Sequence, residues 1–390
     1  MIPFEFSLKT KVFFGKDTEK RTGEIVASFG LKKVLLHYGQ GSVVKTGLLD
    51  RVKKSLMEAG IEICELGGAK PNPEIGLVRE LRQLARDQQV EAIIAIGGGS
   101  AIDSAKYAAA SFYYEGDPFD LGTRKHIPEK GLPVGVILTI AAAGSEMSTS
   151  AVVTEPNTKT KQGFNSHLNQ PLFSIMNPEL TYTVSKYQTA IGVVDMMMHT
   201  LERYFMPSAP LEFADYMAES LLRAVMEAGP IALKEPENYD ARATLMVASS
   251  WAHNGLTSIG KPVAMPVHML EHVVSGLYPD VLHGAGLSVL FPAWALYYYA
   301  FDVEKFDRFA RKVMDVHLSD KLENARTGIL KLKAFFGSLG MPLTLTELGI
   351  ENPDIEWMVQ KLTKGGTRVV DHFVKPLDQD VAKAIYESCR

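Results

Sequence analysis

Residues 92–103 read Ala-Ile-Ile-Ala-Ile-Gly-Gly-Gly-Ser-Ala-Ile-Asp, and this stretch decides the fold class of the chain. The apolar run 92–96 predicts a strand buried on both faces, because a strand with one wet face would alternate apolar and polar residues. A helix predicted over 101–112 follows at once, and Ser100 with Asp103 forms an N-cap pattern. The glycines between strand and helix let a phosphate approach free N–H groups at the helix start. A tight turn that binds nothing is the alternative, but it needs fewer than three glycines.

Outward from this stretch, the first half of the chain alternates strands and helices. Such alternation predicts a parallel sheet covered on both faces. Residues 163–177 are harder to assign, apart from a final strand at 174–176. The other predicted strands are 11–14, 33–38, 61–66 and 134–139, and the other predicted helices are 48–59 and 75–88.

After about Thr183 the strand-like runs end and helical patterns dominate. Proline and glycine separate these helices, for example at Pro230 and Pro236. We therefore predict a Rossmann-like α/β nucleotide-binding domain over 1–184 and an all-helical metal- and substrate-binding domain over 185–390. The predicted helices are 185–205, 211–228, 240–256, 266–277, 283–301, 304–317, 325–339 and one from 378.

Composition restricts the class of protein. The chain has 390 residues, 46% of them hydrophobic, and a net charge of −4, which argues against nucleic acid as a main partner. Cys64 and Cys389 are the only cysteines, so no disulfide framework is expected. The N-terminus lacks the pattern of a signal peptide, and the longest apolar run, 134–144, is too short to span a bilayer. We expect a cytoplasmic protein with no membrane segment.

Candidate metal ligands lie in the helical half. In the helix 185–205, which Ser185 and Gln188 cap and Pro207 ends, Asp195 and His199 are four residues apart and share one face. A plain hydrogen bond between them is one explanation, and a divalent cation is another.

Further histidines strengthen the case for a cation. His268 and His272 are again four residues apart, and His283 opens the segment His-Gly-Ala-Gly. One carboxylate with up to three imidazoles suits a transition metal. The spacing matches no structural zinc finger, which favours a site with an open coordination position.

Two more strand-to-helix junctions resemble nucleotide loops. Gly39-Gln-Gly41-Ser42 follows the strand 33–38, and no carboxylate ends that strand where NAD-binding folds usually place one. This absence leaves room for the 2′-phosphate of NADP near Ser42. Residues 139–146, Thr-Ile-Ala-Ala-Ala-Gly-Ser-Glu, form the third junction, for which close packing of helix on sheet is an equally good explanation.

The ordered set of motifs resembles the iron-containing (group III) alcohol dehydrogenases, closest to their butanol dehydrogenase branch. The motifs are Gly67-Gly-Ala-Lys-Pro-Asn-Pro73, Gly97-Gly-Gly-Ser-Ala-Ile-Asp-Ser-Ala-Lys106, Ala142-Ala-Gly-Ser-Glu146, Asp195-x3-His199, His268-x-x-Glu-His272 and His283-Gly-x-Gly. The resemblance covers nearly the whole chain and implies a dehydroquinate-synthase-like fold. Two departures are Ala143 in place of a threonine and a gap between His272 and His283 that is one residue longer than usual.

The resemblance implies roles for individual residues. Asp195, His199, His268 and His283 would hold a divalent metal, iron first and zinc second, and His272 would relay a proton. Lys161 matches a family lysine near the cofactor. The other cofactor contacts would be Gly39, Gly41, Ser42, Gly98, Gly99, Ser100, Asp103, Thr139 and Ser145.

The expected activity is metal-dependent hydride transfer between NADP(H), favoured over NAD(H), and a small, fairly apolar alcohol or aldehyde such as butanal. Methionines 196–198, 265 and 269 and tryptophans 251 and 294 lie near the motifs and suggest such a substrate. A homodimer or larger homo-oligomer is expected, with the strand 11–14 as one pairing edge. Alternatives are a dehydroquinate-synthase-type lyase, a glycerol-type dehydrogenase and a non-catalytic nucleotide sensor.

Overall fold

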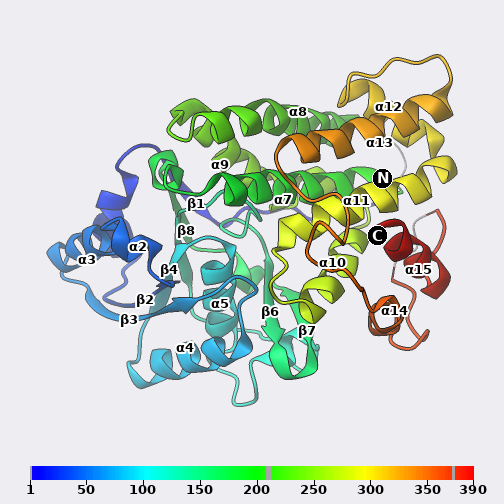
Figure 1. Cartoon of the computed structure of the whole chain (residues 1–390). Helices are drawn as coiled ribbons and strands as arrows, with labels where there is room; N and C mark the ends of the chain where they lie inside the picture. Colours follow the sequence, from blue (N-terminus) through cyan, green and yellow to red (C-terminus); the bar gives the residue numbers. More distant parts are fainter. Residues whose placement is uncertain (1, 208–211, 371–373) are drawn as a thin grey trace. The chain divides into compact units, whose positions relative to one another are not determined.

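The structure is a computed structural model that describes residues 2–207, 212–370 and 374–390 (Figure 1). The chain forms two compact units, and each is built from more than one segment. The sheet unit consists of Ser7–Val184 and Glu237–Ser250. The helical unit consists of Met1–Phe6, Ser185–Pro236 and Trp251–Arg390. The predicted domain boundary near residue 184 would place residues 237–250 in the helical domain. In the structure these residues cluster with the sheet unit instead.

The sheet unit contains a six-stranded parallel sheet, as the alternating pattern predicts. Its strands lie in the order β1-β8-β5-β4-β2-β3. Each predicted strand is present, and the difficult stretch 163–177 ends in the last of them. The bounds are β1 (Lys11–Phe14), β2 (Lys33–Gly39), β3 (Glu62–Ala69), β4 (Ala92–Gly97), β5 (Val134–Leu138) and β8 (Phe173–Met176).

Alternate side chains of the central strands enter two different cores. On β4, Ile93 and Ala95 pack with helices α4 (Ile75–Asp87) and α5 (Gly99–Ala110), whereas Ile94 and Ile96 pack in the core on the other face. Helices α1 (Thr22–Ser28) and α3 (Leu48–Glu58) supply that second core. Burial on both faces explains why these strands read as continuous apolar runs.

The strand order brings the three candidate nucleotide loops to neighbouring positions. After β2 the chain builds β3 on one side and then returns to build β4 on the other side of β2. Strand β5 lies next to β4, and all these pairs are parallel. Loops that follow β2, β4 and β5 therefore leave the same edge of the sheet side by side. A reversal of strand order at this edge is the usual ligand-binding position of open α/β sheets.

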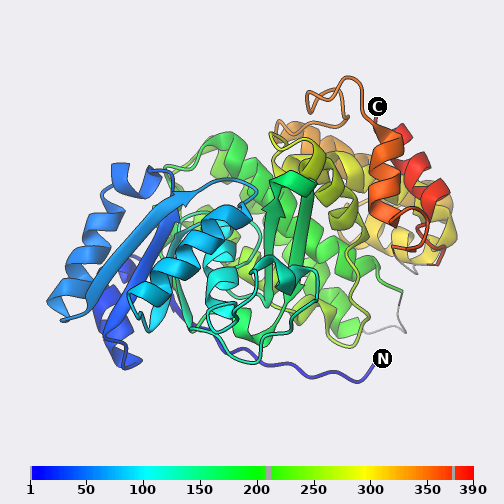
Figure 2. The same ribbon diagram turned by 90° about the horizontal axis from the view of Figure 1, so that it is seen from below.

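The sequence did not predict an antiparallel hairpin in the sheet unit. Strands β6 (Ser150–Glu155) and β7 (Thr160–Asn165) pair along their whole length and lie side by side in Figure 2. Of the β7 side chains only Phe164 is buried, so this strand lacks the apolar alternation that reveals a strand. Its turn contains Lys159 in the left-handed region, at φ 48°.

The helical unit contains the predicted series of helices, with three corrections. Pro230 lies inside α8 rather than ending it, the helix predicted over 304–317 ends at Lys312, and a helix over 355–363 was not predicted. Ser185 caps α7 as predicted, because its side chain accepts from the backbone N–H of Gln188. The predicted start at residue 211 lies outside the described residues. The bounds are α7 (Lys186–Phe205), α8 (Glu212–Lys234), α10 (Pro266–Leu277), α11 (His283–Tyr298), α12 (Val303–Lys312), α13 (Lys321–Ser338), α14 (Ile355–Thr363) and α15 (Gln379–Ser388).

Helix α9 (Tyr239–His253) begins in the sheet unit and ends in the helical unit. The remaining short helices are α2 (Ser42–Lys45) and α6 (Phe119–Gly122). Among the described residues, none of the helices has the length and apolar character that crossing a lipid bilayer requires.

Candidate active site

Three helices of the helical unit bring the four predicted metal ligands together. Asp195 and His199 come from the middle of α7, and His268 comes from the first turn of α10. His283 is the first residue of α11, so the longer gap before it does not remove it from the cluster. Asp195 Oδ1 lies 3.1 Å from His199 Nδ1, 3.9 Å from His268 Nε2 and 4.0 Å from His283 Nε2.

These separations suit a common cation. Ligand atoms that each lie about 2.1 Å from one metal ion are about 3–4 Å apart. Candidate ligand atoms of Asp195, His199 and His268 all lie within 4.8 Å of one another, and all three residues are buried. In the described residues, His268 Nε2 is a buried nitrogen for which no hydrogen-bond partner is found. A buried polar atom without a partner is costly, so a ligand at this position would be stabilising.

Two buried glutamates orient the histidines. Glu202, on α7, accepts a hydrogen bond from His268 Nδ1, and Glu271, on α10, accepts one from His283 Nδ1. Each imidazole with a protonated Nδ1 presents the lone pair of Nε2 toward Asp195. Carboxylates that hold the far nitrogen of a metal-binding histidine fix the tautomer in this way.

The sequence did not predict that either glutamate orients a histidine. Glu202 carried a usable signal, because it follows Asp195 by seven residues and His199 by three and so shares their face of the helix. Glu202 also accepts from the backbone N–H groups of Val267 (2.6 Å) and His268 (3.3 Å). It therefore caps the start of α10 with a negative charge, which the helix dipole favours.

His253 is a further histidine that the sequence did not single out. Its ring packs on the ring of His199 with centroids 4.0 Å apart. The two residues are far apart in sequence, and nothing near His253 forms a motif. Arg203 donates to the carbonyl oxygen of His199 and also to that of Ala252 at 3.2 Å.

Two glycines explain the segment His283-Gly-Ala-Gly. A Cβ atom on Gly284 would lie 2.4 Å from the carbonyl oxygen of Ile191, so α11 contacts the backbone of α7 directly. A Cβ atom on Gly286 would lie 2.8 Å from Cγ of Glu271, on α10. Small residues at both positions allow α11 to place His283 beside Asp195.

Burial and opposite charges shift the pKa values in the cluster. Burial, together with the charge of neighbouring His268, lowers the pKa of His199 to about 4 although Asp195 acts to raise it. Burial also acts to lower the pKa of His268, but the carboxylates of Glu202 and Asp195 outweigh it and raise that pKa to about 9. Although burial opposes ionisation of Asp195, the adjacent histidines hold its pKa well below the usual range.

The formal charges suit a divalent cation. Three carboxylates, on Asp195, Glu202 and Glu271, are buried around the histidines. The buried guanidinium of Arg203 offsets one of these negative charges. The raised pKa of His268 means that a bound cation would have to displace its second ring proton. With all imidazoles then neutral, these groups carry two formal negative charges, and buried charges need partners.

His272 is not grouped with Asp195, His199 and His268, but candidate ligand atoms of Glu271, His272 and His283 also lie within 4.8 Å of one another. The ring centroid of His272 is 5.4 Å from that of His283 and 6.4 Å from that of His268. The residue is half-buried, whereas His268 is buried. The apolar residues near the motifs also differ in their burial. Methionines 196–198 and Trp294 are core residues, whereas Met265 and Met269 are only partly covered.

In the sheet unit, the glycine-rich loop joins β4 to α5 as predicted. Strand β4 ends at Gly97, and α5 begins at Gly99 with Gly98 as its N-cap residue. The predicted N-cap role of Ser100 is wrong, because Ser100 already lies inside the helix and no side chain caps it. Gly41 has φ 144° and precedes α2, where Ser42 is the first residue.

Other predicted cofactor residues also surround this edge of the sheet. Thr139 directly follows β5, and its N–H donates to the carbonyl oxygen of Gly97. Asp103 and Ser145 hydrogen-bond each other at 2.6 Å. Lys161, on β7, donates to Asn72 at 3.1 Å.

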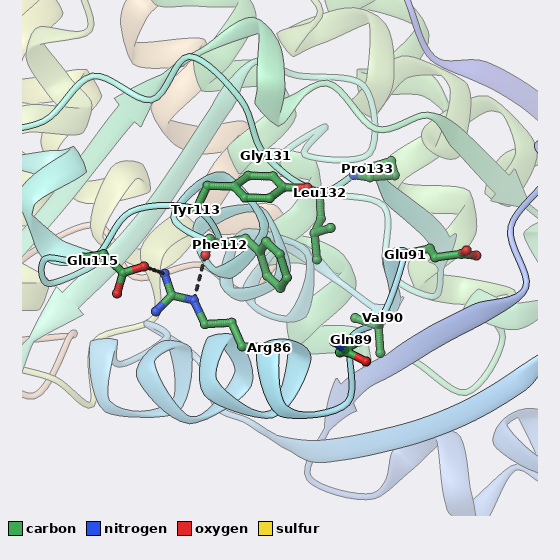
Figure 3. A pocket seen from close by; sticks show the side chains of 10 residues that line it. All are labelled: Arg86, Gln89, Val90, Glu91, Phe112, Tyr113, Glu115, Gly131, Leu132 and Pro133. Atoms are coloured by element: carbon green, nitrogen blue, oxygen red, sulfur yellow. Dashed lines mark hydrogen bonds and ion pairs between the residues drawn. The ribbon is translucent and has the colours of Figure 1, made fainter.

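A concavity of 610 Å³ lies at the opposite edge of the same sheet (Figure 3). Its wall includes Leu132 and Pro133, which lead into β5, and Arg86, from α4. The Arg86 guanidinium is engaged there, since Nε donates to the carbonyl of Phe112 at 2.7 Å and Nη2 lies 3.5 Å from Glu115. This edge holds the amino ends of the strands, where open α/β sheets do not usually bind nucleotides.

Comparison with known proteins identifies the family. Residues 9–178 match the model for iron-containing alcohol dehydrogenase, and residues 189–389 match the C-terminal model of the Fe-containing alcohol dehydrogenase family. The chain belongs to the iron-containing alcohol dehydrogenases. The chain is therefore an oxidoreductase, an NAD(P)H-linked alcohol dehydrogenase or aldehyde reductase, and this assignment favours the dehydrogenase over the lyase alternative.

Individual relatives cover nearly the whole chain. NADH-dependent butanol dehydrogenase A of Clostridium acetobutylicum is 40% identical over 371 residues, 94% of this chain and 95% of the relative. NADPH-dependent aldehyde reductase YqhD of Escherichia coli is 35% identical over 393 residues, 99% of each chain. The crystal structure of NADH-dependent butanol dehydrogenase A from Thermotoga maritima has a TM-score of 0.96 at 36% identity, covering 100% of this chain and 99% of that one.

Proposed function

We propose that Asp195, His199, His268 and His283 hold a divalent cation, Fe²⁺ first and Zn²⁺ second, in a reductase of small aldehydes. The convergence of His268 Nε2 and His283 Nε2 on Asp195 Oδ1 carries this proposal. Three nitrogen donors and one oxygen donor suit Fe²⁺ and Zn²⁺ alike. The family description favours iron.

In this proposal the glutamates and His272 have separate roles beside the cation and the coenzyme. A bound cation supplies Lewis acidity to the substrate oxygen, and the nicotinamide supplies or accepts the hydride. Glu202 and Glu271 keep Nδ1 of their histidines protonated and Nε2 directed inward. His272, half-buried beside His283, exchanges the proton of the substrate oxygen with solvent, for which an imidazole is suited near neutral pH.

We propose NADP(H) as the preferred coenzyme. Strand β2 ends at Gly39, and the residues that follow, Gln40 to Ser42, carry no negative charge. A carboxylate here would bind the ribose 2′-hydroxyl of NAD and repel a 2′-phosphate. The relatives include both NADH- and NADPH-dependent enzymes, so the ratio must be measured.

The proposed substrate is a short, fairly apolar aldehyde such as butanal, or the matching primary alcohol. Two features support this choice: the names of the butanol dehydrogenase relatives and the partly covered Met265 and Met269 that accompany His268. Thioether side chains adapt to apolar ligands of varied shape.

The test is butanal-dependent oxidation of NADPH and NADH in parallel, on protein as isolated, after chelation, and after addition of Fe²⁺ or Zn²⁺. Activity should disappear with chelation, return with metal and be greater with NADPH. Asp195→Ala should abolish activity and leave NADPH binding intact. An enzyme that remains fully active after removal of all metal would overturn the proposal.

We also propose a homodimer that uses the edge strand β1. In the described residues, β1 pairs with β8 on one side, and Val12 and Phe14 are 39% and 41% exposed. An open edge with exposed apolar side chains favours pairing with another strand. Sedimentation should give a dimer, and Phe14→Lys should shift it toward monomer. A wild-type protein that sediments as a monomer would contradict this proposal.

A further inference from the structure

A buried lysine that the proposed chemistry does not use lies behind the nucleotide loops. Lys106, on α5, is 1% exposed. Its ammonium lies within hydrogen-bond distance of five oxygen atoms. These are the carbonyl oxygens of Ser145 (2.6 Å), Ser148 (3.0 Å) and Ser150 (2.9 Å) and the hydroxyl oxygens of Ser145 (3.0 Å) and Ser148 (3.2 Å).

These oxygens come from one short segment, residues 145–150, which connects the third nucleotide loop to β6. An ammonium has three N–H donors, which matches the three carbonyl groups. Removing the ammonium would take the Lys106 donor from all three carbonyl oxygens and would leave that of Ser150 with only the 3.3 Å hydrogen bond from the Ser148 hydroxyl. Because buried oxygens that lose a donor are costly, the segment would have to change its path.

Asp103 attaches the same segment from one turn earlier on α5. Its carboxylate accepts from the hydroxyl of Ser145 (2.6 Å) and from the N–H of Val152 (3.0 Å). Residues three apart share one helix face, so α5 presents an anion and a cation to the segment together. Ser145 joins them, since it donates to Asp103 and accepts from Lys106.

Residues 140 and 143, which directly precede this segment, contact the glycine-rich loop. A Cβ atom on Gly98 would lie 3.2 Å from the side chain of Ile140, and one on Gly99 would lie 3.7 Å from that of Ala143. The loop after β4 and the loop after β5 are therefore packed against each other. A displacement of residues 145–150 would be transmitted to this contact.

We propose that Lys106 is a positioning residue that holds the two nucleotide loops in one arrangement and thereby sets the affinity for the nicotinamide coenzyme. The inference rests on the proposed coenzyme site. Lys106 does not touch the coenzyme itself. Its ammonium acts through residues 145–150, and a neutral side chain of the same length cannot replace it.

The test compares Lys106→Met with Lys261→Met. Lys261 is a matched control, because it is also buried and binds Asp215 at 2.5 Å, but in the helical unit. NADPH binding is measured by nucleotide fluorescence, and thermal unfolding is recorded for both variants. We expect both to unfold at lower temperature and only Lys106→Met to weaken NADPH binding, by about tenfold or more.

Kinetics separate positioning from simple instability. In Lys106→Met the KM for NADPH should rise, and kcat at saturating NADPH should stay close to that of wild type. If Lys106→Met instead lost kcat with an unchanged KM for NADPH, as expected for a protein that is unstable but correctly shaped, the proposal would be overturned. A folded Lys106→Met that binds NADPH as tightly as wild type would also overturn it.

If Lys106→Met does not fold, Ser148→Ala removes one oxygen partner of the ammonium and should weaken NADPH binding less. Unchanged NADPH affinity in Ser148→Ala would then overturn the proposal. A wild-type protein that binds neither NADPH nor NADH would refute the coenzyme site itself. Wild-type binding with unchanged variants would refute only the role of Lys106.

Discussion

Replacing Glu202 by glutamine tests how the metal cluster is oriented. Glu202 accepts from His268 Nδ1 and from the backbone N–H groups of Val267 and His268. Glutamine keeps the shape but has one acceptor oxygen, and its NH2 group would face N–H donors. The lost charge-assisted hydrogen bond corresponds to about 1.5–3 kcal/mol. We therefore expect metal affinity to fall by about 10–100-fold, the usual effect of removing such a partner.

The assay is competition for Zn²⁺ between the metal-stripped protein and a chelating dye. Glu219→Gln is the matched control, because Glu219 is also a buried carboxylate of the helical unit. It accepts from Tyr204 (2.9 Å) and Arg308 (2.6 Å). The control should lose stability and keep its Zn²⁺ affinity. If Glu202→Gln bound Zn²⁺ within about twofold of wild type, the inferred tautomer control of His268 would be wrong.

Three further predictions concern other features. Gly284→Ala should cost about 1–3 kcal/mol of stability in urea unfolding, because its Cβ would overlap the carbonyl of Ile191, and unchanged stability would contradict this close approach. His253→Leu should speed metal loss to a chelator about two- to tenfold by removing the ring on His199, whereas His253→Phe should not. Burial lowers the pKa of His37 from 6.5 to about 4, so protonation favours the unfolded chain as pH falls below 6.5. Stability of the sheet unit should fall by about 1.5 kcal/mol between pH 6.5 and 5 from this group, and that part should be missing in His37→Asn.

The sequence predicted those parts of the fold that have strong local signals. Continuous apolar runs such as 92–96 revealed the strands, and the cap at Ser185 marked the start of α7. Strand β7 was missed because its side chains are mostly polar or half-buried. Helix α14 was missed although Asp354 supplies a recognisable cap, since its side chain accepts from the N–H of Trp357.

The site shows the same limit. Residue types and spacing alone made Asp195, His199 and the later histidines candidate ligands. The resemblance to a family then assigned His268 and His283 as ligands and His272 as a proton relay. Hydrogen bonds between helices have weaker signals in the sequence. The role of Glu202 could not be predicted without knowing that His268, from another helix, faces its carboxylate. His253 has no local signal, because only the packing of α9 beside α7 brings its ring onto His199. The prediction that Ser100 caps α5 failed because the glycines start the helix earlier.

The path of the chain through its two units has a consequence for how the protein is made. Residues 237–250 belong to the sheet unit, although they follow a long segment of the helical unit. In this stretch Ser249 and Ser250 donate to the buried carboxylate of Glu146, and Met246 fills part of the core under α5. On the ribosome, the sheet can therefore pair its strands early but cannot complete its core until residue 250 has left the exit tunnel.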